Sequence, residues 1–397
     1  MLKDPKTFLV PKLRFPEFRN EPPWVTRKLG ELFRQREETG RDDLRLLSLT
    51  DKEGIIPQEE SNRKNNASVD RSKYLRVARG DIVYNTMRMW EGRSALATLE
   101  GIVSPAYTVC EPCEETNSLF FAHYFKTSQL VAQFARYSQG LVKDTLNLKF
   151  EAFARILAPT PSPAEQQKIA ECLSTLDELI EAESRKLNAL TDHKKGLMQQ
   201  LFPREGETRP RLRFPEFQDA PEWESKTVDD LVDTITPPKK LLTSDYRPAG
   251  QFPVIDQSQD YICGWTDDEE AVIDDDLPVV VFGDHTCALK FVDRPFAQGA
   301  DGIKILKAKA DVRDDFLFYS LQANPVQQES YKRHFSTLRE RVVAFPDKDS
   351  GEQRRIAACV SSLDDLIAAQ SERLEALRAH KRGLMQQLFP NPSEFES

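Results

Sequence analysis

The chain has 397 residues, of which 39% are hydrophobic and 30% charged, and its formal net charge is −9. This length predicts two or three domains. No apolar run approaches the roughly 18 residues of a membrane span, and the N-terminus lacks a signal pattern, so we expect a cytoplasmic protein. The negative charge excludes an indiscriminate phosphate binder, although a local basic face can still bind DNA.

Two segments of the chain occur twice. PKLRFPEF begins at Pro11 and PRLRFPEF at Pro210, and Trp24 and Trp223 keep the same spacing. Residues 165–203 and 352–390 form a longer repeat, identical at most positions and without a gap. The interiors between these borders do not resemble each other. Repeated borders around different interiors predict one architecture that carries two specificities.

The short repeated segments are extended, rich in proline, and both basic and aromatic. Arg14, Arg213, Trp24 and Trp223 are possible DNA contacts. Packing of Phe15, Phe18, Phe214 and Phe217 onto the domain is the favoured interpretation, because these large apolar side chains gain stability when they are buried.

The first interior, within residues 1–160, contains two polar clusters that suit nucleic acid. A nine-residue loop from Asn85 to Arg93 follows the apolar strand Ile82–Tyr84, and a second cluster follows a helix predicted over Leu119–Tyr137. Arginine and amide side chains are the usual readers of base edges. An ordinary turn with a packed tryptophan is the alternative for the first loop. The candidate contacts are Asn85, Arg88, Trp90, Arg93, Gln139, Lys143 and Asn147.

The longer repeats predict two helices, over 161–203 and 347–390. Ser162 and Pro163 suit a helix start, Asp349 takes the equivalent role, and Phe-Pro ends both copies. Apolar residues recur three and four apart, which is typical of a coiled coil. Each helix would be roughly 60 Å long, or about 18 base pairs of DNA. The predicted seam comprises Leu173, Leu176, Ile180, Leu187, Leu190, Val360, Leu363, Ile367, Leu374 and Leu377.

Polar residues interrupt this seam at the same places in both copies. They are Glu183 and Gln370, then Lys194 and Lys381. Polar groups in a helical interface cost stability but can fix its register and orientation. In an antiparallel pair of the two copies, a seam position near one end of one helix would face a position near the other end of its counterpart.

The second interior, within residues 204–346, has a loop after the apolar strand Val279–Phe282 and a helix predicted over Asp314–Gln322. Catalysis by Asp284 and His285 is disfavoured, because no nucleophile or metal ligand is suitably spaced. A basic patch follows at 332–341. It contains His334, Arg339 and Arg341 together with the candidate DNA contacts Lys332 and Arg333. The candidate DNA contacts here are Asp284, His285, Thr286, Lys290, Lys332 and Arg333.

Neither a catalytic nor a metal site is predicted. Cys110 and Cys113 form a lone CxxC without the second ligand pair that zinc needs, so the six cysteines are expected to be reduced thiols. A nucleotide-binding glycine loop is also missing from the sequence. We expect no cofactor on this chain.

The lead into EQQKIA, the long helix ending GLMQQLFP and its second copy resemble the specificity subunit (HsdS) of type I restriction–modification systems. The resemblance covers nearly the whole chain, including the interior stretch GDIVYNTMRMWEGRSALA. It implies two target-recognition domains that each read half of a split double-stranded DNA sequence. It also implies two methyltransferase subunits that bind S-adenosylmethionine, and a restriction subunit, the motor, that uses ATP and Mg.

The predicted fold is mixed, of the α+β class: two α/β target-recognition domains separated by an antiparallel two-helix coiled coil, with an internal pseudo-twofold repeat. The predicted boundaries are 1–160, 161–203, 204–346, 347–390 and a tail, 391–397. A coiled-coil scaffold or inhibitor that binds only proteins is one alternative function. An autonomous nuclease or methylase is the other, and the missing nucleotide motifs count against it.

Overall fold

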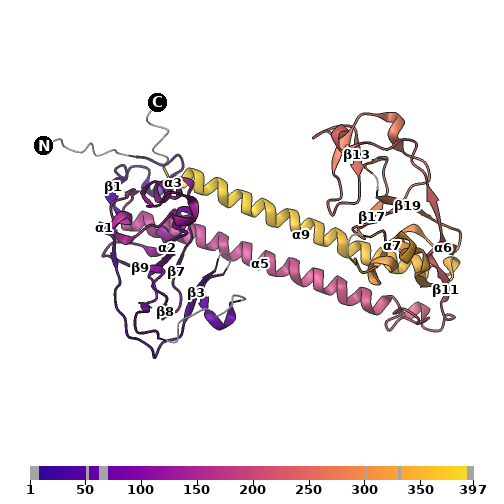
Figure 1. Ribbon diagram of the computed structural model, residues 1–397, viewed down its shortest axis with the longest axis horizontal. Helices are drawn as coiled ribbons and strands as arrows, with labels where there is room; N and C mark the ends of the chain where they lie inside the picture. The colour runs from indigo at the N-terminus through magenta and orange to yellow at the C-terminus, as the bar shows by residue number, and fades with distance from the viewer. Residues whose placement is uncertain (1–8, 51–52, 62–69, 301, 330–331, 391–397) are drawn as a thin grey trace. The chain divides into compact units, whose positions relative to one another are not determined.

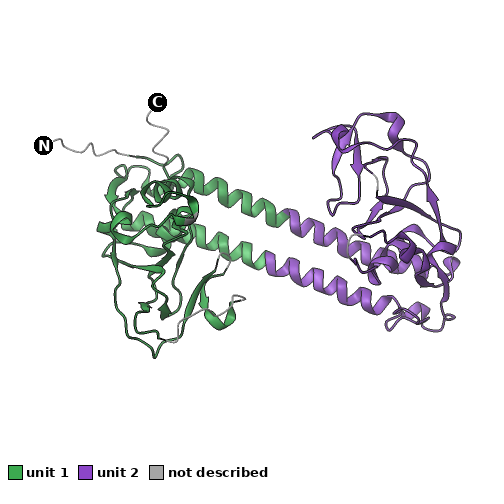
Figure 2. Ribbon diagram, viewed as in Figure 1, with its two compact units in different colours: residues 1–183, 373–397 green, residues 184–372 purple. Residues whose placement is uncertain are grey.

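The computed structural model (Figure 1) describes residues 9–50, 53–61, 70–300, 302–329 and 332–390. The predicted tail, 391–397, lies outside the described residues. The chain forms two compact units, residues 1–183 with 373–397 (unit 1) and residues 184–372 (unit 2), as Figure 2 shows. Helices α5 (Pro163–Leu201) and α9 (Glu352–Leu388) each contribute one part to either unit. Each unit therefore combines one of the two unlike interiors with parts of both repeated helices.

Unit 1 places short strands and helices before α5. Its central sheet is antiparallel throughout, in the order β2-β9-β6-β7, and β1 pairs with β10 beside it. The elements are β1 (Val25–Lys28), α1 (Leu29–Leu32), β2 (Phe33–Gln35), β3 (Leu47–Thr50), β4 (Gly54–Pro57), β5 (Leu75–Val77), β6 (Ile82–Asn85), β7 (Ser94–Leu96), β8 (Gly101–Val103), β9 (Tyr107–Pro112), α2 (Ser118–Tyr124), α3 (Ser128–Tyr137), α4 (Phe150–Phe153) and β10 (Leu157–Thr160).

Unit 2 repeats this plan. Its sheet β12-β19-β16-β17 is also antiparallel throughout, β11 pairs with β20, and a second sheet, β14-β13-β18-β15, is added. The elements are β11 (Glu224–Thr227), α6 (Val228–Leu231), β12 (Val232–Ile235), β13 (Phe252–Ile255), β14 (Gly264–Thr266), β15 (Val272–Ile273), β16 (Val279–Gly283), β17 (Leu289–Val292), β18 (Phe296–Gln298), β19 (Ile303–Ala308), α7 (Asp314–Ala323), α8 (Phe335–Glu340) and β20 (Val342–Phe345).

The short repeated segment is fastened to the start of a long helix in each unit. The Arg14 guanidinium donates from Nε and Nη2 to the Glu165 carboxylate at 2.8 and 2.7 Å. In unit 2, Arg213 donates to Glu352 at 2.7 Å from both nitrogens. Glu165 is 1% exposed and Glu352 is fully buried. Phe15 and Phe214 of these segments are half-buried against the cores of their units, as the packing interpretation expects, and the arginines are committed to buried ion pairs.

The tryptophan that follows each short repeat is buried against two phenylalanines. Trp24 packs edge-on against Phe120, with ring centroids 5.9 Å apart, and both rings contact Phe389. The equivalent group in unit 2 is Trp223 with Phe316, at 5.8 Å, and Phe202 on Phe316. Phe202 and Phe389 directly follow the last residues of the two long helices. The core of each unit thus joins the end of one helix to the domain carried by the other.

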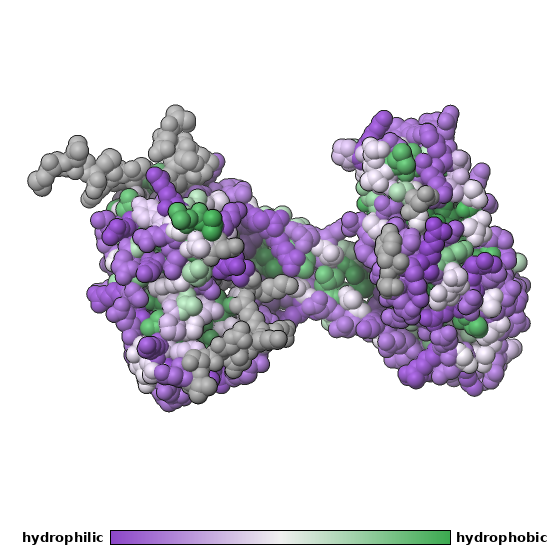
Figure 3. Space-filling model, in the orientation of Figure 1, coloured by the Kyte–Doolittle hydropathy of each residue, from purple (hydrophilic) through white to green (hydrophobic). Residues whose placement is uncertain are grey.

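The two long helices pair antiparallel within each unit. In unit 1, Ile169 and Leu173 near the start of α5 share a core with Leu388 at the end of α9. In unit 2, Leu201 at the end of α5 shares a core with Val360 near the start of α9. Every predicted seam residue is buried or half-buried. The predicted antiparallel pair is confirmed, and hydrophobic side chains along it come into view in Figure 3.

The lysines that interrupt the seam form one ion pair in each unit. Lys194 Nζ lies 2.5 Å from Asp364 Oδ1, and Lys381 Nζ pairs in the same way with Asp177. Both partners come from the opposite helix, at positions that correspond in the repeat. Because the lysines are only 15% and 19% exposed, a shifted register would leave two largely buried charges unpaired. These pairs therefore specify the antiparallel register.

Two predicted details of the helices are wrong. Asp349 does not begin α9, because a 3-10 turn, η8 (Lys348–Ser350), comes first and Ser350 Oγ accepts from Glu352 N at 3.2 Å. The single helix predicted over Leu119–Tyr137 is broken into α2 and α3. Thr127 lies in the break and donates its hydroxyl to Tyr124 O, which satisfies the end of α2.

The burial of His123 is expected to make the stability of unit 1 depend on pH. It lies on α2 within 3.3 Å of Ser174 Oγ, and burial, with a contribution from Lys381, lowers the pKa of His123 to about 4 against the opposing effect of Asp177. The unfolded state therefore binds the proton first as pH falls from 6.5 toward 4. We expect unit 1 to lose roughly 2 kcal/mol between pH 7 and pH 5 through this group, at about 1.4 kcal/mol per pKa unit.

Urea unfolding at both pH values measures the loss, with His123→Gln as the comparison. The variant lacks the titrating group, so its stability should fall less over the same interval. An equal fall in the two proteins would show that His123 does not contribute.

Candidate nucleic-acid interface

In unit 1 the structure brings the two predicted clusters together. The loop after β6 contains the 3-10 turn η3 (Met89–Glu91), and Leu148 N donates to Thr86 O at 2.9 Å, tying the second cluster to this loop. Lys143 Nζ lies 5.9 Å from the centre of the Trp90 ring. The loop from 86 to 93 and the segment from 138 to 149 thus form one surface, which we call interface 1.

Side chains of interface 1 are organised by local contacts. Glu91 pairs with Arg88 at 3.2 Å and with Arg93 at 3.0 Å, which holds both guanidinium groups at the surface. Trp90 Nε1 donates to Met87 O at 3.1 Å, and Asn85 Oδ1 accepts from Met87 N at 2.9 Å. The arginine side chains are 46% and 37% exposed, whereas the Asn85 carbonyl accepts a hydrogen bond within the turn.

The second cluster of interface 1 is a narrow loop with an exposed tip. Gln139 and Asn147 exchange two backbone hydrogen bonds, of 2.9 and 2.8 Å, at its base. Gly140 has φ +148°, and a Cβ there would lie 2.5 Å from Thr145 O, so only glycine fits this turn. Leu141 and Lys143 lie exposed at the tip. The loop can present a cation and an amide to a partner that fits closely.

Unit 2 has its predicted clusters at the equivalent place. His334 N donates to Asp284 O at 2.8 Å, just as Leu148 N donates to Thr86 O in unit 1, and each acceptor directly follows its strand. His285 Nδ1 lies 3.2 Å from Lys332 O. The turn from 284 to 286 and the described residues around Lys332 and Arg333 form the corresponding surface, interface 2.

Three of the predicted contacts in unit 2 have structural partners instead. Asp284 is 5% exposed, and its Oδ1 accepts from His334 N and Phe335 N at the start of α8. Lys290 is 5% exposed and donates to two backbone carbonyls, Asp256 O and Asp260 O. Thr286 Oγ1 donates to Gln257 O. Asp284 and Lys290 are corrected to scaffold residues because their charges are buried and bonded within the domain.

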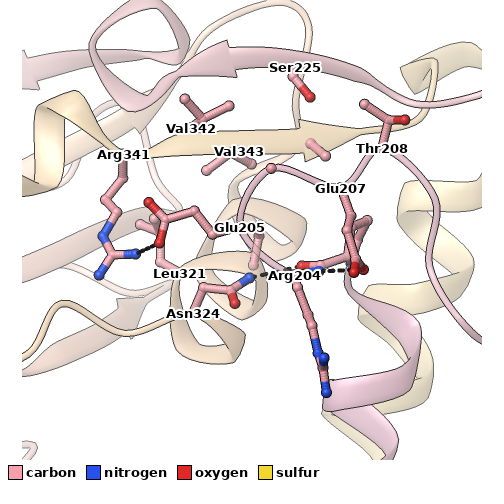
Figure 4. A pocket seen from close by; sticks show the side chains of 14 residues that line it. Arg204, Glu205, Glu207, Thr208, Ser225, Leu321, Asn324, Arg341, Val342 and Val343 are labelled. Atoms are coloured by element: carbon pink, nitrogen blue, oxygen red, sulfur yellow. Dashed lines mark hydrogen bonds and ion pairs between the residues drawn. The ribbon is translucent and has the colours of Figure 1, made fainter.

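The predicted basic patch at 332–341 is smaller than the sequence suggests. His334 is buried, and Arg339 is paired with Asp229 at 2.5 and 2.7 Å. Arg341 pairs with Glu205 at 2.6 Å beside a cleft of about 280 Å³ at the end of α5 (Figure 4). That cleft is lined by residues 203–208, which follow α5, and by residues of β11, α7 and β20. Lys332 and Arg333 remain at interface 2.

Interface 2 contains a cavity of about 400 Å³ that no pattern in the sequence indicated. Beside His285 and Arg333 it is lined by Lys240, Gln257 and Lys304. Lys304 sits between the buried Ile303 and Ile305 of β19, so the alternation along that strand indicates an outward lysine. Lys240 carries no comparable signal, because only the fold brings it beside the loop.

Within the described ranges, no group of three or more His, Cys, Asp and Glu side chains is placed to hold a metal ion. In the same part of the chain, no helix is long and apolar enough to cross a membrane.

Comparison with known proteins agrees with this geometry. Residues 21–192 match the family described as the type I restriction modification DNA specificity domain. The type I restriction enzyme MjaVIII specificity subunit of Methanocaldococcus jannaschii is 23% identical over 349 residues, covering 80% of this chain and 82% of its own. The putative MjaX specificity subunit of the same organism is 24% identical, covering 81% and 80%.

Solved structures share the fold. The S subunit of a type I restriction–modification system from M. genitalium superposes with a TM-score of 0.64 at 15% identity, over 96% of this chain and all of that one. A chain from a structure of assembly and conformational transition in the type I R-M system gives 0.53 at 16% identity, over 93% and 98%. Residues 21–192 therefore match a type I restriction modification DNA specificity domain, and most of the chain is similar to type I specificity subunits in sequence and in fold.

Proposed function

We propose that this chain directs a type I restriction–modification complex to a bipartite DNA target, of which unit 1 reads one half and unit 2 the other. One observation carries the proposal. Each unit has its own sheet with the same strand order, its own buried arginine–glutamate ion pair and its own tryptophan cluster. The loops at equivalent places in the two units carry different side chains. A common frame with different loops suits two readings of one kind of partner.

Interface 1 combines the groups that DNA recognition needs. Arg88 and Arg93 are suited to guanine edges or phosphates, and Gln139 to adenine. Trp90 and Lys143 add a flat surface and a further charge. We propose these five residues as the DNA contacts of unit 1, with Asn85 and Asn147 shaping the loops that carry them.

Interface 2 presents a different set to the second half of the target. We propose His285, Lys332 and Arg333 as its contacts, with Thr286 as a support of the turn. Arg333 has a side chain that is 82% exposed, so it can reach a groove without local rearrangement. With a formal net charge of −9, the chain gains only local attraction from these cations, so we expect the partner subunits to strengthen DNA binding.

The partners and cofactors follow from this role. We propose that two methyltransferase subunits, which bind S-adenosylmethionine, assemble on the chain, and that a restriction subunit using ATP and Mg joins them. This chain contributes recognition and no chemistry of its own. Its place of action is the cytoplasm, where the host DNA is found.

The test is a map of modified adenines in the DNA of a host that expresses the chain with its methyltransferase partner. We expect a split, asymmetric motif with a constant gap between its halves. A continuous motif, or no motif, would contradict the proposal. A catalytically inactive partner controls for modification by other enzymes.

A further inference from the structure

The cavity at interface 2 has a strongly cationic lining. Among the described residues that line its space of about 400 Å³ are three cations, Lys240, Lys304 and Arg333, and the carboxylate of Asp284. The segments that supply them lie far apart in the sequence: the residues after β12, strand β19 and the segment before α8. In a chain with more acidic than basic residues, such a concentration of positive charge marks a place for an anion.

Two of these cations contact neighbouring side chains of unit 2. Lys304 Nζ lies 5.3 Å from the centre of the Phe335 ring, a cation–π contact that fixes its direction. Arg333 Nε lies 4.0 Å from Asp284 Oδ2, near the limit of an ion pair. The other oxygen of Asp284 accepts from two backbone N–H groups, so this carboxylate is bound to the α8 terminus and neutralises the rim only in part.

The floor of the cavity is built from an amide packed on glycine. A Cβ on Gly302, which has φ +105°, would lie 2.7 Å from the side-chain amide atoms of Gln257. Gln257 Oε1 is buried and has no hydrogen-bond partner among the described residues. Because this oxygen is sealed from solvent, Gln257 cannot present its full amide to the edge of a base.

We propose that this cavity binds a phosphodiester group of the DNA backbone at the second half of the target, with Lys304 and Arg333 as the phosphate contacts. The inference rests on the proposed function and goes further, because it assigns these side chains to positioning the DNA and not to reading its sequence. The Lys304 ammonium is a point charge that fits phosphate oxygens and lacks the paired donors and acceptors that base reading needs, and the Arg333 guanidinium beside it can bind the same phosphate through two donors. In this assignment Gln257 lines the cavity and does not contact a base.

Lys304→Gln in the assembled methyltransferase complex tests the assignment. Binding is measured at several salt concentrations with a duplex that carries the target and with a scrambled duplex. We expect affinity for both to fall roughly tenfold, as for one charge-assisted hydrogen bond. The slope of log K against log salt should shrink by about one unit, because the variant neutralises one phosphate fewer. The methylated motif should not change.

Lys304→Arg should retain the salt slope, and Lys348→Gln, at an exposed site outside the cavity, should behave as wild type. Thermal unfolding of each complex shows whether the variants are folded, and Arg333→Gln gives a second variant with an exposed side chain. An altered base in the second half of the motif, with an unchanged salt slope, would overturn the assignment in favour of base reading. Unchanged binding would overturn it too. Failure of the proposed function looks different: the wild-type complex would not prefer the target duplex.

Discussion

Arg14→Ala is expected to destabilise unit 1 by about 3–5 kcal/mol, the usual cost of leaving a buried charge without its partner. Glu165 is 1% exposed and accepts two of the Arg14 hydrogen bonds, so the variant strands a carboxylate in the core. It also frees the Glu21 and Pro22 carbonyls that Arg14 binds. The short repeated segment should then separate from α5.

Hydrogen exchange of backbone amides measures this effect separately in the two units. Protection should fall in the sheet of unit 1 and should be nearly unchanged in the sheet of unit 2. Arg213→Ala should give the reverse pattern, because Arg213 and Glu352 make the same contact in unit 2. Arg19→Ala, at an exposed site, is the control. An equal loss of protection in both units from either variant would contradict the assignment of one arginine–glutamate ion pair to each unit.

The repeated segments predicted the arrangement of the two long helices, because each copy contains equivalent residues for helix pairing and for the buried arginine–glutamate ion pair. The spacing of apolar residues gave the seam of α5 and α9, and the seam lysines indicated a fixed register. Their partners, Asp177 and Asp364, could not be predicted, since both lie off the seam and meet the lysines only when the helices run antiparallel. Contacts over more than 150 positions, such as Arg14 with Glu165, leave no trace in local pattern.

The common fold of the two interiors was not visible in the sequence. Strands of three to six residues with different side chains form sheets of the same order in both units. A sheet of this kind requires only alternation and burial, which many sequences satisfy. The duplicated glutamine makes the likeness clear: Gln166 accepts from Asn117 N, and Gln353 accepts from Arg313 N, just before α2 and α7.

The candidate interfaces were predicted as loops more successfully than as residues. Glycine and polar runs after buried strands located both loops, and the structure joins each to its second cluster. The prediction of Asp284 and Lys290 as DNA contacts was wrong because residue type does not reveal burial. Each side chain is hydrogen-bonded to backbone groups inside the domain. Lys240 and Lys304 were missed because the cavity depends on how distant segments meet.

Exchange of the recognition domain in unit 1 is expected to have the largest effect on function. Replacing residues 29–156 by the corresponding segment of another specificity subunit keeps Arg14, Trp24, β1 and both long helices. It replaces all of interface 1 and none of interface 2. We expect one half of the target to change completely, while the other half and the gap remain as they were, since each unit has its own core and loops.

Long-read sequencing of methylated adenines in a host that carries the exchanged chain and its methyltransferase partner tests whether the two units read independently on one frame. The account predicts a split motif in which only one half is new. A motif that changes in both halves, or whose gap changes along with one half, would contradict it.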